Sequence, residues 1–93
     1  MRECFKNYLI IQGYSEYTAK GTPSTVYDYI KRIDFVCEQE ACNWLDLSSN
    51  INQVICDYDK GGVKERLGDI SHRAVINALK RFKDFLYFIK FNI

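Results

Sequence analysis

The last quarter of the chain, residues 71–93, constrains the fold more than any other stretch. Apolar residues recur through it at steps of four, three, four and three residues, as Val75, Leu79, Phe82, Leu86 and Ile89. This spacing predicts one helix with a continuous apolar stripe, which Ala78 and Phe85 widen. Such a stripe has to be buried against other elements, so the segment predicts a helix that closes a small bundle.

The opposite side of the same helix is mostly cationic. Its residues are Arg73, Asn77, Lys80, Arg81 and Asp84. Residues 1–59 carry five Lys and Arg against nine Asp and Glu, a net charge of −4, whereas residues 60–93 carry eight against three, a net charge of +5. This asymmetry indicates a nucleic-acid or acidic partner, although a solvated helix face accounts for the same charge.

Length and composition set the class of protein. The 93 residues suffice for one domain with a single modest core, and 47% hydrophobic with 27% charged residues is ordinary globular composition. Polar residues interrupt every apolar run before it reaches membrane-spanning length, and no signal peptide is recognisable. We therefore expect one soluble, cytoplasmic domain over residues 1–93 with no membrane partner.

Four cysteines leave two interpretations open. Cys4, Cys37, Cys42 and Cys56 would suit two disulfides in a secreted protein. Without a signal peptide, free thiols in a reducing compartment are favoured. A zinc site would need short paired spacings, whereas Cys37 and Cys42 are five residues apart and the single histidine is distant, so no metal or cofactor is expected.

Three further helices are expected before the last one. The first runs from Glu3 to Gln12 and stops at Gly13. The second begins at Thr22-Pro23, because Thr caps free N–H groups and Pro suits the first helical position, and it runs to about Glu40. Within it, Asp28 and Arg32 are expected to form an ordinary surface pair.

The third helix is short and carries the apolar residues Ile51, Val54, Ile55 and Tyr58. Residues 43–50 before it are expected to be a connector. Residues 60–68 after it contain three glycines and three cations, which favour a mobile basic loop over a further turn of helix. Asp69 or Ser71 then caps the last helix. The predicted fold class is all-α, a small four-helix bundle.

No catalytic constellation is recognisable. The sequence contains no glycine-rich phosphate loop, no zinc-protease pair and no nucleophile elbow. We therefore expect a protein that is not an enzyme by itself, with no catalytic residue. The single histidine, His72, is either a phosphate contact or a surface or capping residue at a helix start.

Two helix beginnings combine hydroxyl side chains, free N–H groups and the positive end of a helix dipole, a combination suited to phosphate. They lie at residues 22–25 and 71–73. Cations could extend these contacts, and Asn77 is a residue type that reads an adenine edge. The candidate DNA-binding residues are Ser24, Thr25, Lys31, Ser71, His72, Arg73, Asn77, Lys80 and Arg81.

Nearly the whole chain resembles the N-terminal, SAM-like core-binding domain of tyrosine recombinases, the phage-type integrases of mobile elements. The resemblance lies in FKNYLIIQGYS, then STVYDYIKRIDFV with Thr25, Tyr29 and Ile33 at the Thr, Tyr and Leu places of the family. It continues in WLDLSSNINQVICDY and ends in SHRAVINALKRFKDFLYFIKFNI, which is similar to the closing helix of the family.

The resemblance implies one half of a clamp around double-stranded DNA, with the second and fourth helices toward the duplex. The positions carried over are Ser24, Thr25, Lys31, Arg73, Asn77 and Arg81. In the family, DNA integration and recombination need a separate C-terminal catalytic domain with a tyrosine nucleophile and a His-x-x-Arg motif. His72 has no Arg three residues later, so this motif is absent and the resemblance implies the C-terminal catalytic domain of the parent chain as a partner. The resemblance also implies other recombinase protomers as partners.

A helical protein interaction module is the alternative. Its docking edge would be the aromatic end of the chain, with Phe88, Phe91 and Ile93. A terminal apolar patch of this kind usually marks a missing neighbour.

Overall fold

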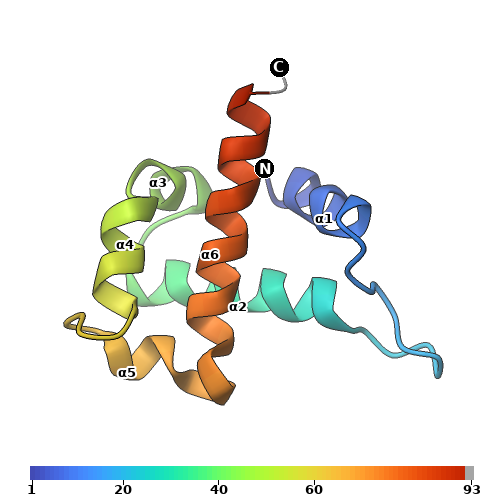
Figure 1. Ribbon diagram of the computed structural model, residues 1–93, viewed down its shortest axis with the longest axis horizontal. Helices are drawn as coiled ribbons and strands as arrows, with labels where there is room; N and C mark the ends of the chain where they lie inside the picture. The colour runs from blue at the N-terminus through green and yellow to red at the C-terminus, as the bar shows by residue number, and fades with distance from the viewer. Residues whose placement is uncertain (92–93) are drawn as a thin grey trace.

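The computed structural model describes residues 1–91, and this part is built from helices (Figure 1). Their bounds are α1 (Arg2–Ile11), α2 (Thr25–Gln39), α3 (Trp44–Ser49), α4 (Ile51–Tyr58), α5 (Glu65–Gly68) and α6 (Ile70–Phe91). The prediction of a small all-α bundle is confirmed, and the four expected helices correspond to α1, α2, α4 and α6. No helix in residues 1–91 is both long enough and apolar enough to cross a membrane.

Helix α6 is the central element of the bundle. It crosses α2, with α1 on one side and α3, α4 and α5 on the other (Figure 1), and α2 and α6 share the most extensive contact of the helix pairs. The stripe expected from the sequence faces this crossing, because Val75, Leu79 and Phe82 are fully buried. Leu86 and Ile89, further along the stripe, are partly buried against the core.

An aromatic cluster fills the space where α1 and α3 meet α6. The ring of Phe5 lies 5.4 Å from that of Phe82 and 5.5 Å from that of Phe85, between centroids. Trp44 packs edge-on against Phe5 and Phe82, at 5.9 and 5.4 Å. Pairs of this geometry contribute about 0.5–1.5 kcal/mol beyond their buried area, so the cluster fixes α1 and α3 on the central helix.

The start of α2 differs from the prediction. Thr22-Pro23 does not begin the helix, since Ser24 is the N-cap residue and Thr25 the first helical one. Thr22 is instead held in the preceding loop, where its carbonyl accepts the N–H of Thr18 at 2.8 Å and the two threonine hydroxyls lie 2.7 Å apart. Pro23 forms a β-bridge with Tyr17. The loop thus folds back on itself and removes Thr22 from the helix start.

The two segments expected to lack helix each contain a short one. In the first, the side chain of Asn43 accepts the N–H of Asp46 at 2.8 Å and caps α3. In the second, α5 lies where a mobile loop was predicted, which corrects that expectation. Gly68 is buried, and a Cβ there would overlap the carbonyl oxygen of Tyr58. The glycine therefore permits close packing of α5 on α4 rather than mobility.

The first turn of α6 is not a regular helix. Ser71, His72 and Arg73 have φ angles of 54°, 58° and 67°, in the left-handed region, so the right-handed helix begins at Ala74. A left-handed residue other than glycine costs roughly 1–2 kcal/mol, and three in succession are unusual. The prediction that Asp69 or Ser71 simply caps this helix is therefore wrong.

Candidate nucleic-acid interface

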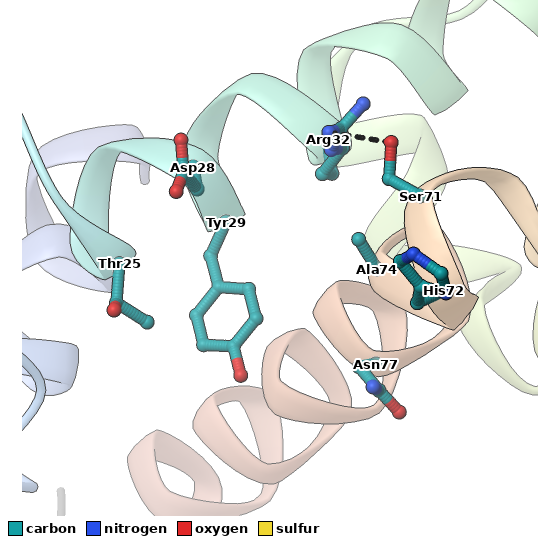
Figure 2. A pocket seen from close by; sticks show the side chains of 8 residues that line it. All are labelled: Thr25, Asp28, Tyr29, Arg32, Ser71, His72, Ala74 and Asn77. Atoms are coloured by element: carbon teal, nitrogen blue, oxygen red, sulfur yellow. Dashed lines mark hydrogen bonds between the residues drawn. The ribbon is translucent and has the colours of Figure 1, made fainter.

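A pocket of about 360 Å³ lies between the N-terminal halves of α2 and α6 (Figure 2). It brings together four of the nine predicted residues, which are Thr25, Ser71, His72 and Asn77. The remaining lining residues are Asp28, Tyr29, Arg32 and Ala74. Three hydroxyls, an imidazole, an amide and a guanidinium thus line one hollow, together with a single carboxylate.

Arg32 is the residue that the sequence analysis missed. Its Nη2 donates to Ser71 Oγ at 3.1 Å, across the gap between α2 and α6 (Figure 2). Its Nε atom is buried without a hydrogen-bond partner in residues 1–91. The expected surface pair with Asp28 is not formed, and Arg32 makes no ion pair within the described part of the chain. A guanidinium with unused donors beside a pocket is suited to an anion.

A signal for Arg32 was present in the sequence. It follows Thr25 by seven residues, so both lie on one face of α2. The sequence analysis instead selected Lys31 from this helix and assigned Arg32 to a surface pair with Asp28.

The left-handed turn at residues 71–73 places Ser71 and His72 at the rim of this pocket. Both side chains are exposed, and both line the pocket together with Asn77 from the first turns of α6. Strained backbone of this kind persists only where the surroundings hold it, and it clusters at functional sites. Here one such restraint is a backbone hydrogen bond, in which the N–H of Arg73 donates to the carbonyl of Asp69 at 3.0 Å.

Arg73 and Lys80, also predicted to contact DNA, are paired inside the fold. Arg73 contacts Asp59 at 2.8 Å and Asp69 at 3.1 Å, and Lys80 contacts Asp59 at 3.2 Å. Hydrogen bonds from Arg73, from the N–H of Lys60 and from Lys80 hold the pKa of Asp59 well below its usual range. These cations therefore tie α6 to the end of α4, and a phosphate would have to compete with Asp59 for them.

Arg81 is also engaged. Its Nε lies 3.0 Å from Asp84 Oδ2, and a hydrogen bond with Tyr14 raises the pKa of Arg81. The side chain is about a third exposed. It lies near Tyr29 on the side of α6 that faces the loop before α2. Arg81 thus borders the pocket region without lining it.

The two remaining candidates lie outside the pocket. Ser24 is half-buried, and its N–H donates to the carbonyl of Glu16 at 3.0 Å. Lys31 is exposed, and like Arg32 it makes no ion pair among the residues described. The unpaired positive charge near the pocket therefore comes from α2, not from the cationic face of the last helix.

The chain was compared with models of protein families, with curated proteins and with solved structures, and none of them matches it.

Proposed function

We propose that this chain is the DNA-binding module of a site-specific tyrosine recombinase, holding duplex DNA at the recombination site mainly through phosphates. Catalysis would belong to a separate C-terminal domain of the parent protein. The observation that supports this most is the pocket between α2 and α6. There the guanidinium of Arg32, which has no carboxylate partner in residues 1–91, donates to the hydroxyl of Ser71, and Thr25 lines the same pocket.

In this proposal a backbone phosphate lies at the mouth of the pocket. Arg32 supplies a charge-assisted hydrogen bond, which is roughly twice as strong as a neutral one, and the hydroxyls supply further donors. Asn77 faces the adjacent groove, where its amide can pair with an adenine edge. Asp28, the acidic lining residue, repels a second phosphate and so limits how deeply the backbone enters.

A fluorescence anisotropy titration with labelled duplex DNA at two salt concentrations tests the proposal. The wild-type chain should bind at low salt and lose affinity steeply as salt rises, because each neutralised phosphate releases counterions. Arg32→Gln should weaken binding about tenfold or more and lower the salt slope by about one.

Lys83→Gln is the matched control for this titration. It removes the same charge from an exposed position on α6, and Lys83 lines a different hollow, with Ser48 and Ile51. It should change binding much less than Arg32→Gln. Absence of binding at low salt, or equal effects of the two variants, would refute the assignment.

The alternative is a helical protein interaction module with an aromatic docking edge. It is favoured by the exposure of Tyr87 and Phe88, at 65% and 38%. The ring of Phe88 also packs against that of Tyr8 in a tilted arrangement, 5.2 Å between ring centroids. The Phe91 side chain and Ile93, which belong to the predicted edge, lie outside the part described. Sedimentation velocity, which measures self-association, distinguishes the two functions. Self-association that Tyr87→Ser abolishes, in a chain that does not bind DNA, supports the alternative.

A further inference from the structure

Helix α2 ends in a motif that brings two cysteines together. Ala41 has a φ of 52°, in the left-handed region, and its N–H donates to the carbonyl of Glu38 at 3.2 Å. The N–H of Cys42 donates to the carbonyl of Cys37 at 3.0 Å. These two bonds around a left-handed residue define a Schellman motif, in which the side chains at the positions of Cys37 and Cys42 meet.

The two cysteines lie next to each other at the end of α2, because the Schellman motif joins their backbones. Cys37 is buried in the core at 8% exposure, and Cys42 is half-buried and packs against that core. Each thiol influences the pKa of the other, as expected for neighbouring groups. A direct N–H···O bond between two residues keeps their Cα atoms on the order of 6 Å apart, and disulfides span Cα separations of about 4.4–6.8 Å. The backbone hydrogen bond thus places the two residues in the range of Cα separations that disulfides span.

We propose that Cys37 and Cys42 form a reversible dithiol–disulfide pair that is oxidised by a low-molecular-weight disulfide such as oxidised glutathione. Cys42 is the entry point, because it lines a hollow of about 210 Å³ on the surface, with Leu47 and Val54 at its apolar side. Cys37 lies behind it in the core and acts as the resolving thiol. This modification is independent of DNA binding, since the pair lies outside the pocket that contains Arg32.

The reaction balances as two thiol–disulfide exchanges. The Cys42 thiol loses its proton to solvent, and the thiolate attacks one sulfur of the glutathione disulfide, releasing the first glutathione thiolate. The Cys37 thiolate then attacks the Cys42 sulfur of the mixed disulfide and releases the second glutathione. The two protein thiols are oxidised, the glutathione disulfide is reduced to two thiols, and the protons lost by the protein end on these.

The environment makes this exchange slow at neutral pH and faster in base. Burial raises the pKa of Cys37 to about 12, and the Cys42 thiol adds to this shift. Burial also raises the pKa of Cys42, with Asp46 and Glu40 acting in the same direction. Because only the thiolate attacks, the rate of thiol–disulfide exchange should rise as the pH increases toward the raised pKa values of the two thiols.

The other two cysteines provide the contrast. Cys4 and Cys56 are exposed, on α1 and α4, and neither makes a thiol contact in residues 1–91. Each should therefore accept glutathione as a stable mixed disulfide, because no second thiol displaces it.

The test uses the full chain with Cys4→Ser and Cys56→Ser, incubated folded with oxidised glutathione at pH 8 and analysed by intact-mass spectrometry. The expected product has lost two hydrogens and carries no glutathione. Adding Cys37→Ser should convert this product into a stable adduct with one glutathione on Cys42.

Two results would overturn the proposal. One is a glutathione adduct on Cys42 that persists although Cys37 is present. The other is a folded chain whose two thiols stay reduced at pH 8 although the same chain forms the disulfide once unfolded in urea. Circular dichroism of each variant before the reaction shows that the folded state is the one tested.

Discussion

Gly68→Ala tests the packing of α5 on α4 directly. A Cβ at this position would overlap the carbonyl oxygen of Tyr58 and lie 2.9 Å from its carbonyl carbon and 3.3 Å from its Cβ. Most of these atoms are backbone, so α5 or α4 has to move. Overpacking of this kind costs about 1–3 kcal/mol, and we take about 3 because backbone cannot change rotamer. Alanine also lowers the conformational entropy of the unfolded chain, which stabilises the fold by about 0.4–1 kcal/mol. The expected net loss of stability is therefore about 2–3 kcal/mol.

The loss of stability is measured by urea unfolding and by thermal unfolding. Both are followed through the fluorescence of Trp44, the single tryptophan of the chain. For a domain of this size, 1 kcal/mol shifts Tm by about 4–8 °C, so Gly68→Ala should lower Tm by roughly 8–24 °C. Gly21→Ala is the control, since Gly21 has a φ of 81° but no atom within 4 Å of an added Cβ. It should cost only about 1–2 kcal/mol, from backbone conformation. A Gly68→Ala variant that is no less stable than this control would refute the close packing of α5 on α4. It would support the mobile loop that the sequence analysis predicted.

Three further variants have definite expected outcomes. Tyr58→Phe removes the hydroxyl that donates to Glu40 Oε2 at 2.9 Å, and should cost about 1.5–3 kcal/mol in urea unfolding because the acceptor is charged. His72→Gly should stabilise the fold by up to about 1 kcal/mol, because it relieves a left-handed φ, and should weaken DNA binding in the anisotropy titration. Asp59→Asn should lower Tm at pH 7, and by progressively less as the pH falls from about 4 toward 2. Since hydrogen bonds led by Arg73 depress the pKa of Asp59, the stabilisation is fully present above the unfolded pKa of about 4 and is lost as pH falls through the lower pKa of the folded state.

Periodicity predicted α1, α2, α4 and α6 because each buries one stripe, and it failed for the shortest helices, α3 and α5. The stripe of α6 could be read from Val75, Leu79 and Phe82, and all three are buried. Helix α5 has four residues, too few to show a period, and its stability comes from contacts with α4 and α6. Gly68 was interpreted as a sign of mobility because a sequence does not show which backbone passes close to a glycine.

The left-handed turn before Ala74 lay beyond sequence reasoning for a different reason. Ser71, His72 and Arg73 are not residue types that favour positive φ, apart from a modest tendency of histidine. Their conformation is imposed by tertiary contacts, including Arg73 with Asp59 and Arg32 with Ser71. Both contacts join residues far apart in the sequence, which a pattern within one helix does not contain.

A cationic side chain can bind an anion when no carboxylate lies next to it in the fold, whatever the net charge of its part of the sequence. The count by sequence assigned −4 to residues 1–59 and +5 to the remainder. In the fold, Asp59 from the acidic part lies against Arg73 and Lys80 from the basic part, and Asp69 also pairs with Arg73, so two of the predicted DNA contacts already have carboxylate partners. Arg32 was counted with the acidic part, yet its guanidinium has no carboxylate partner in residues 1–91, and its buried Nε has no hydrogen-bond partner there. If DNA binds at the pocket, Arg32→Gln must therefore weaken binding more than Arg73→Gln, although the charge count predicts the reverse.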